Sequence, residues 1–179
     1  MLRVKDREFK TNECIFFATI DDENSLSWNF RVSTYGQKFD EFWEPVVSGE
    51  NMLIKLPQAD VIVGETVAVP DAYDPKSDKY FFTMYVFEHE DMYQNRIKFL
   101  QRRNNIFQIL WTAKCNINWD EEYGQGLDVC IDANIEFKGI TTQTASLAEA
   151  KSRLDKHYSS SSFEAIANDE GHISFRLPE

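Results

Sequence analysis

The chain has 179 residues, enough for one domain to bury a sizeable core without disulfides or structural metals. Its hydrophobic share of 42% and aromatic share of 14% predict a folded protein with a sheet-rich core. The formal net charge of −11 disfavours binding to nucleic acids and to anionic membranes, and it favours a basic protein partner.

The first part of the chain shows mainly period-two patterns, which are typical of strands. Residues 14–20 form a short apolar run suited to a buried strand, and residues 21–25 predict a turn. Apolar and polar side chains alternate from residue 26 to 36, which predicts a half-buried strand. Residues 37–49 are less regular, and the stretch "FDEFWEP" within them predicts either a helical turn that ends at Pro45 or an irregular aromatic loop.

The middle of the chain predicts a series of strands separated by turns. Residues 51–57 and 65–75 predict short strands whose limits are marked by prolines. The stretch "KYFFTMYVFEHE", residues 79–90, predicts one long strand. Residues 91–94 are expected to form a turn, and residues 95–103 the next strand.

A hairpin is predicted at Asn104-Asn105, because asparagine tolerates the left-handed conformation that a two-residue loop requires. Residues 106–119 would form its second strand. A further strand is expected over residues 127–142. Its alternation shifts phase near Asn134, since Ile140 leaves the face that the preceding apolar residues share, and this indicates a bulge or the end of the strand.

One helix is predicted, over residues 146–158. Ser146 and Glu149 form a capping-box pattern at its start. Its apolar stripe consists of Leu147, Ala150, Leu154 and Tyr158. The following residues, 163–177, predict a hairpin around "NDEG", with a short helix over residues 163–167 as the alternative.

These elements predict a single domain, residues 1–179, of the mainly β (α+β) class. We expect a largely antiparallel sandwich or curled sheet of about nine or ten strands with one C-terminal helix. The crossover helices of a parallel βαβ fold are missing from the pattern.

The cysteines Cys14, Cys115 and Cys130 lie in or beside apolar runs, and no two are close in sequence. This spacing argues against a disulfide framework or a zinc knuckle and predicts buried free thiols in a reducing compartment. The N-terminus lacks the apolar stretch of a secretory signal, and no run reaches the length of a membrane span. We therefore expect a cytoplasmic protein.

No motif in the sequence names a reaction. A glycine-rich phosphate loop and a G-x-S-x-G nucleophile elbow are both missing. His89 lies between Glu88 and Glu90, where a carboxylate could hold it for acid–base chemistry. Only the two glutamates could share a metal ion, because alternate strand residues face the same side, and an exposed histidine among charges is the simpler interpretation. We expect no cofactor, no metal and no enzymatic activity.

The stretch "NWDEEYGQGLD", residues 118–128, has the composition of a functional site. It does not fit a calcium-binding EF-hand loop, because counting from Asp120 places Gln125 where glycine is needed and Ile131 where glutamate is needed. A glycosidase would need two carboxylates across a cleft, which Asp120, Glu122 or Asp128 could supply, but the spacing does not require this role.

The acidic residues are segregated along the chain. Residues 118–136 hold six acids and no lysine or arginine, whereas residues 92–119 carry five basic residues and no acid. Residues 40–50 and 21–23 are further acid-only segments. Such segregation either steers a basic partner or is compensated internally by the basic hairpin around Arg102-Arg103.

In size, acidity, missing catalytic motifs and aromatic-rich β pattern, the chain resembles the small acidic cytosolic immunity proteins of bacterial toxin–immunity systems. The resemblance implies a tight inhibitor of a cognate basic toxin, often a nuclease. The acids would then mimic a phosphate backbone or pair with the toxin's cations, and the aromatic residues would be anchors. The implied partner-binding residues are Trp119, Asp120, Glu121, Glu122, Tyr123 and Asp128.

Two other functions remain open. A β-sandwich that binds carbohydrate or a small ligand, with a hydrolase as one form, would need a pocket lined by Trp119, Tyr123 and Trp43. An accessory subunit of a larger complex would need no pocket.

Overall fold

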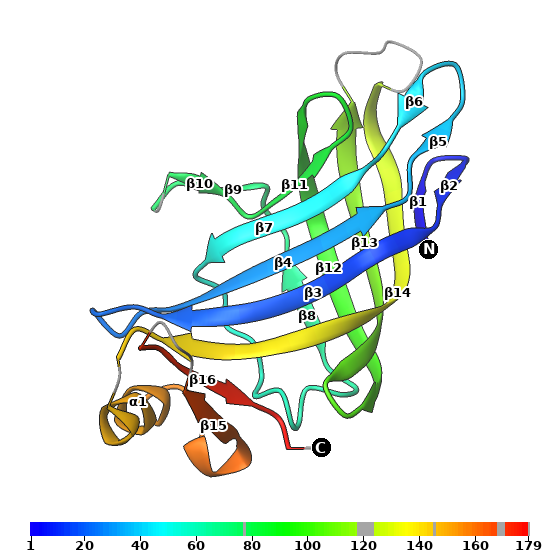
Figure 1. Cartoon of the computed structure of the whole chain (residues 1–179). Helices are drawn as coiled ribbons and strands as arrows, with labels where there is room; N and C mark the ends of the chain where they lie inside the picture. Colours follow the sequence, from blue (N-terminus) through cyan, green and yellow to red (C-terminus); the bar gives the residue numbers. More distant parts are fainter. Residues whose placement is uncertain (77, 118–123, 145, 168–170, 179) are drawn as a thin grey trace.

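The computed structural model describes residues 1–76, 78–117, 124–144, 146–167 and 171–178. Strands make up 61% of the chain and helical residues 7%, so the prediction of a mainly β protein is confirmed. The expected sandwich is wrong, because the main strands curl and close into a barrel (Figure 1). Closure needs a pairing between the first and last long strands, which no local pattern encodes.

Seven strands form the closed ring, in the order β14, β13, β12, β11, β7, β4 and β3. Neighbours in the ring are antiparallel, except that β3 and β14 run parallel and close it. Among the described strands this is the one parallel pair. The ring strands are β3 (Thr11–Ile20), β4 (Leu26–Thr34), β7 (Val46–Met52), β11 (Phe82–Tyr85), β12 (His89–Arg103), β13 (Ile106–Ile117) and β14 (Gly124–Thr142).

Shorter elements extend the ring and cover its ends. The helix α1 and the β15–β16 hairpin lie at one end of the molecule, and the β5–β6 hairpin lies at the other (Figure 1). The pairs β1–β2, β5–β6, β9–β10 and β15–β16 are antiparallel hairpins, while β8 pairs with β12. These elements are β1 (Leu2–Val4), β2 (Arg7–Phe9), β5 (Gln37–Lys38), β6 (Phe42–Trp43), β8 (Thr66–Val69), β9 (Tyr73–Asp74), β10 (Lys79–Tyr80), β15 (Glu164–Ala167), β16 (Ile173–Arg176), α1 (Leu147–Leu154) and the 3-10 helix η1 (Ser160–Ser162).

The strand β14 serves different neighbours along its 19 residues. Its first part pairs with β13 and β1, and its last part pairs with β3 and β16. The register to β3 slips between Phe137 and Ile140. Gly139, inside this slip, has a φ of +110°, and a Cβ there would lie 2.6 Å from the carbonyl oxygen of Phe175. The predicted phase shift is therefore a glycine bulge, located after Asn134 rather than at it.

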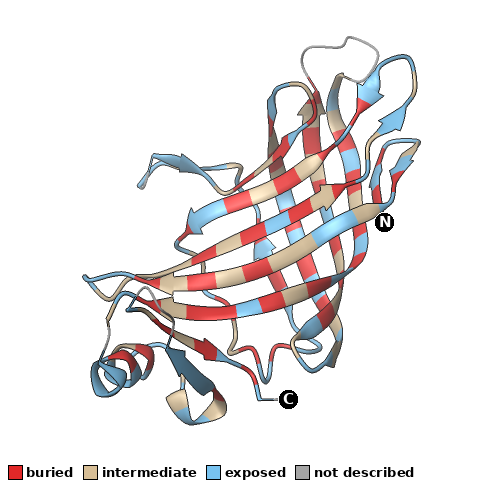
Figure 2. Cartoon of the chain, in the orientation of Figure 1, coloured by how far each residue is buried: buried red, intermediate tan, exposed pale blue. Residues whose placement is uncertain are grey.

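Aromatic side chains fill the interior of the barrel. Phe16 lies at their centre with 0% of its surface exposed. Its ring contacts five other aromatic rings, with centroid separations of 5.0 Å to Phe137, 5.4 Å to Phe30, 5.6 Å to Phe107, 5.8 Å to Phe99 and 6.0 Å to Trp28. Figure 2 shows the matching alternation of buried and more exposed residues along the ring strands. The barrel is thus a packed core.

The turn predicted at residues 91–94 is wrong, because β12 runs through them. The strand absorbs one extra residue there as a bulge, with φ of +54° at Gln94. The buried Asn95 stabilises the irregular backbone by donating to the carbonyl oxygen of Met92 at 3.0 Å. Its own side-chain oxygen accepts a hydrogen bond from the indole of Trp111, also at 3.0 Å. The Asn95 side chain thus pairs with a backbone carbonyl that regular strand pairing would have satisfied.

Of the other predicted elements, two hairpins are confirmed and one long strand is wrong. The Asn104-Asn105 hairpin is confirmed, with φ of +56° at Asn104. The C-terminal hairpin is also confirmed as β15–β16, and residues 168–170 of its turn lie outside the described residues. The long strand over residues 79–90 is wrong, because the chain bends at residues 86–88 and returns as β12. The stretch "FDEFWEP" holds the short strand β6 and no helical turn.

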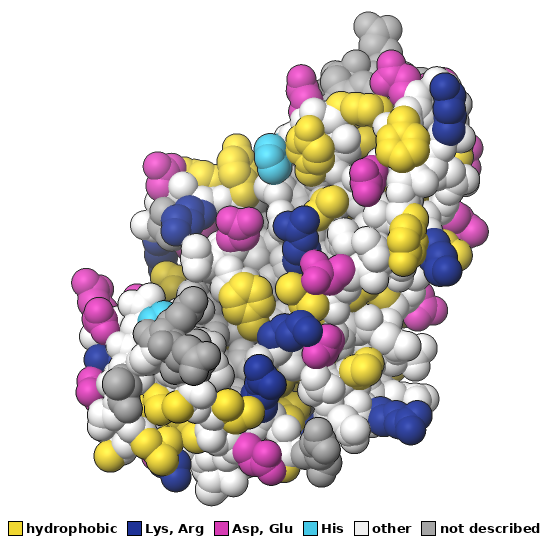
Figure 3. Space-filling view, in the orientation of Figure 1, with side chains coloured by type: hydrophobic (Ala, Val, Ile, Leu, Met, Phe, Trp, Pro, Cys, Tyr) yellow, Lys and Arg dark blue, Asp and Glu magenta, His cyan; other side chains and the backbone are white. Residues whose placement is uncertain are grey.

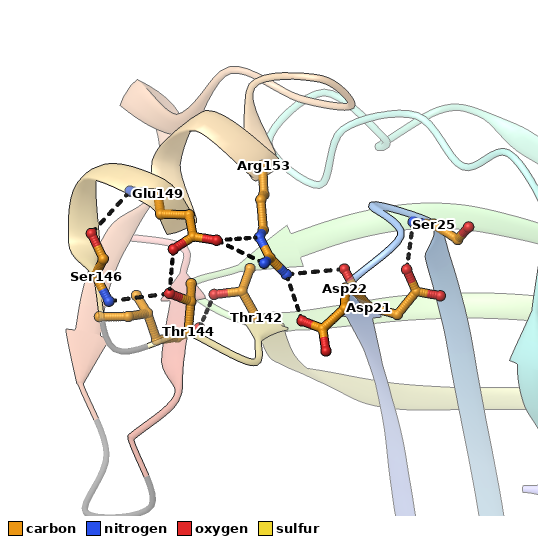
Figure 4. A network of polar contacts seen from close by, with 9 residues as sticks. Asp21, Asp22, Ser25, Thr142, Thr144, Ser146, Glu149 and Arg153 are labelled. Carbon is orange, nitrogen blue, oxygen red and sulfur yellow. Dashed lines mark hydrogen bonds and ion pairs between the residues drawn. The ribbon is translucent and has the colours of Figure 1, made fainter.

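The predicted helix is confirmed but is shorter than residues 146–158. Ser146 caps it by accepting a hydrogen bond from the backbone N–H of Glu149 at 3.4 Å. The other half of a capping box is replaced, since the backbone N–H of Ser146 donates to the hydroxyl of Thr144 at 3.2 Å. The Glu149 carboxylate instead accepts from Thr144 and from Arg153 (Figure 4).

Arg153 fastens α1 to the turn between β3 and β4 (Figure 4). Its guanidinium donates to the backbone oxygen of Asp21 and to the carboxylate of Asp22, each at 3.1 Å, while it also pairs with Glu149 at 2.7 Å. Beside it, His157 Nε2 lies 2.9 Å from the carbonyl oxygen of Asn24. The acid-only segment 21–23 is therefore partly compensated inside the protein.

Replacing the central ring should remove a large part of the free energy of unfolding. We expect Phe16→Ala to lower the free energy of unfolding by about 3–5 kcal/mol, because it removes a buried ring and leaves a cavity among its neighbours. Urea denaturation measures this change. The exposed Leu53 provides a control, and Leu53→Ala should cost less than about 1 kcal/mol. Equal losses for the two variants would contradict an aromatic core centred on Phe16.

Acid should loosen the docking of α1. The hydrogen bond from Arg153, followed by that from Thr144, lowers the pKa of the Glu149 carboxyl. A carboxyl with a lowered folded-state pKa stabilises the folded state above its unfolded pKa, and this stabilisation is lost as the pH falls through the folded pKa. Opening free energies of the α1 amides, measured by hydrogen exchange, should therefore drop between about pH 6 and about pH 3. Glu149→Gln should show a smaller drop, and an identical drop would contradict this assignment.

Candidate binding face

The outer surface of the wall formed by β4, β7 and β11 carries the candidate site. Cross-strand register places Ser33 beside Val46, Val46 beside Tyr85, and Tyr85 beside His89, in one row. Their neighbours along the strands, such as Met84, are buried, so this row faces outward. Figure 3 shows hydrophobic side chains interspersed with acidic and basic ones over this side of the molecule.

Tyr85 and His89 form a ridge, with their ring centroids 5.1 Å apart. Open grooves lie on its two sides. One, of about 390 Å³, is here called the Tyr80 groove and is lined by residues that include Ser48, Asn51, Asp78, Tyr80, Thr83 and His89. The other, of about 730 Å³, is here called the Phe42 groove and is lined by residues that include Glu13, Arg31, Phe42, Glu44, Val46 and Tyr85.

The ring of Phe42 is held in place although 58% of the residue is exposed. It rests on the backbone of Gly36, where an added Cβ would lie 2.1 Å from the ring. Glycine at this position leaves room for the ring, which an added Cβ would push aside. Tyr85, which is 44% exposed, packs beside His89. The Phe42 groove thus has two exposed rings, each in contact with a neighbour.

A partly buried arginine, Arg7, contacts the loop that carries Phe42. The guanidinium carbon of Arg7 lies 4.5 Å from the ring centroid of Phe39 and 4.1 Å from that of Trp43, and the guanidinium pairs with Asp40 at 3.1 Å. A hydrogen bond from the Glu41 backbone and the charge of Arg7 lower the pKa of the Asp40 carboxyl. Trp43 is 0% exposed, so the expectation that it lines a ligand pocket is wrong.

The charges of the Phe42 groove are unevenly balanced. Glu13 pairs with Arg31 at 3.7 Å across β3 and β4, and both side chains are about half exposed. Glu44 is exposed, and in the part of the chain that the structure describes it forms no ion pair. The groove therefore presents one uncompensated carboxylate beside two aromatic rings.

Of the predicted site residues, the structure describes Asp128, which lines neither groove. Asp128 is exposed on β14, where its carboxylate pairs with Lys114 Nζ at 2.7 Å on the neighbouring β13. Its charge is thus balanced within the protein. At the start of β14, Gly124 and Gly126 have positive φ angles. The remaining predicted residues, Trp119, Asp120, Glu121, Glu122 and Tyr123, lie outside the described residues.

The surroundings of His89 do not form the predicted arrangement. Glu90 is buried, with 3% exposed, whereas Glu88 is exposed in the bend before β12, so the two glutamates do not share a face. Within the described ranges, no group of three or more histidine, cysteine or acidic residues could hold a metal ion. The three cysteines are free, as predicted, although only Cys115 is fully buried.

The aromatic walls of the grooves were not predicted as a site. A usable signal was present between residues 79 and 90, because aromatic residues occupy both phases of the alternation. Phe82 points inward and is buried in the core, whereas Tyr85 lies in the opposite phase, points outward and stays exposed. Phe42 offered no such signal, since its exposure depends on the turn that brings it onto Gly36.

Comparisons of the chain with protein-family models, with curated proteins and with solved structures found no match in any of the three. Among the described residues, no helix has both the length and the apolar character needed to cross a membrane.

Cys115 should be the least reactive of the three thiols in the folded protein. Burial, aided by the nearby Glu90 and Asp91 carboxylates, raises its pKa to about 12. Because the thiolate is the reactive form, we expect a disulfide reagent at about pH 8 to modify Cys115 last, after the half-buried Cys130. Mass spectrometry of timed samples locates each modification. Labelling of Cys115 at the rate of Cys130 would contradict its burial.

Proposed function

We propose that this chain is a non-enzymatic binding protein whose partner is a basic protein. The observation that carries the proposal is the Phe42 groove, where two exposed and supported rings lie with an uncompensated carboxylate. Aromatic side chains with a charged neighbour are typical anchors of protein interfaces. The aromatic packing around Phe16 favours binding on the outside, because a ligand inside the barrel would have to displace that core.

The more specific proposal is an immunity protein that neutralises a basic toxin such as a nuclease. The net charge of −11 supports an acidic inhibitor, because it speeds the encounter with a positively charged partner. In this proposal the loop residues 119–123 form a second contact, with their acids facing the toxin's cations and Trp119 and Tyr123 as anchors. Asp128 would contribute once its carboxylate exchanges Lys114 for a cation of the partner.

Binding to the partner should weaken strongly with salt. Affinity purification from the source cell at low ionic strength should recover a basic protein, and calorimetry should show its affinity falling at least about tenfold between about 50 mM and about 300 mM salt. Replacing Asp120, Glu121 and Glu122 together by alanine should also weaken binding, because it removes local contacts.

A control must separate local contacts from net charge. Replacing Glu65, Asp132 and Glu164, which are exposed in other parts of the molecule, by alanine removes the same charge. This control should retain most of the affinity. Recovery of no basic partner, or wild-type binding by the variant of residues 120–122, would rule the proposal out.

A further inference from the structure

We infer that the Phe42 groove is the binding site for an arginine side chain of the basic partner. This inference rests on the proposed function and names the chemistry by which the outer face would recognise that partner. A guanidinium is planar, remains charged and stacks on aromatic rings, and it also donates paired hydrogen bonds to a carboxylate. The groove offers both kinds of contact.

The aromatic contact would come from Phe42 and Tyr85, which line the same groove. Each ring has a contact beside it in the free protein, Phe42 with the backbone at Gly36 and Tyr85 with the exposed ring of His89. A guanidinium entering the groove would stack on the exposed faces of these rings.

The charged contact would come from Glu44, the exposed carboxylate without an ion pair in the described part of the groove. The other acid, Glu13, already has Arg31 as its partner at 3.7 Å. The charged groups that line the groove are these three residues, so its net charge is −1 and one added cation balances it. A neutral side chain would leave the charge of Glu44 uncompensated, and an acidic side chain would be repelled by it.

The same loop already binds a guanidinium in this manner. Arg7 lies against the rings of Phe39 and Trp43 and pairs with Asp40. That internal site combines two rings and a carboxylate, which is the set of groups that the Phe42 groove presents to solvent. The groove therefore has the components that hold an arginine elsewhere in this protein, and a flat guanidinium fits them better than the compact ammonium of lysine.

Nuclear magnetic resonance tests the site with defined probes. The labelled chain is titrated with N-acetyl-arginine amide, with N-acetyl-lysine amide and with a neutral analogue, N-acetyl-norleucine amide. We expect the arginine probe to shift the amide signals of residues 42–44, 46 and 85–87 in a saturable way and to bind several-fold more tightly than the lysine probe. The norleucine probe should produce no saturable shift. Glu44→Gln and Tyr85→Ala should each weaken arginine binding about tenfold.

Tyr35→Ala provides the matched control, because Tyr35 is an exposed aromatic residue that does not line the groove. This variant should bind the arginine probe as well as wild type. All substituted side chains are exposed, and unchanged circular dichroism confirms that the variants fold.

Absence of a saturable shift, equal binding of the lysine probe, or full binding by the Glu44→Gln and Tyr85→Ala variants would overturn the inference. These outcomes differ from failure of the proposed function. If the arginine site is wrong but the function is right, the co-purified basic partner still binds with salt-dependent affinity, and Tyr85→Ala binds it as tightly as wild type. If the function is wrong, no basic partner is recovered.

Discussion

Aromatic packing inside the closed barrel is the constraint on which the rest of the structure depends. The ring of Phe16 meets rings from β4, β12, β13 and β14, so these strands share one core. The glycine bulge in β14 lets this long strand pair with β3 and complete the wall around that core. Because the interior is occupied by side chains, the proposed binding would involve the outer surface.

Local patterns predicted much of the fold. The alternation of residues 26–36, the Asn104-Asn105 hairpin and the capped helix all depend on contacts within a few residues, and they were found where expected. Barrel closure depends on the pairing of β3 with β14, whose partners are more than a hundred residues apart. The bulge at Gln94 likewise depends on the buried Asn95 and its distant partner Trp111, so the sequence around it resembled a turn.

The candidate site was harder to predict for a similar reason. Acidic segments can be read from a sequence, but whether they are compensated depends on their neighbours in space. Asp22 and Asp128 meet Arg153 and Lys114, whereas Glu44 retains its charge beside Phe42 and Tyr85. The groove joins segments that are about forty residues apart and that only the β7–β11 pairing brings together.

The central claim is that the partner binds to the outer wall at β7 and β11. Cross-saturation from the unlabelled basic partner to the labelled chain tests it most directly, because signal loss marks the residues in contact. We expect losses at residues 42–44, 46 and 83–89, with the interior Phe16 unaffected. Losses concentrated on the β12–β13 wall, with the Phe42 groove unaffected, would contradict it.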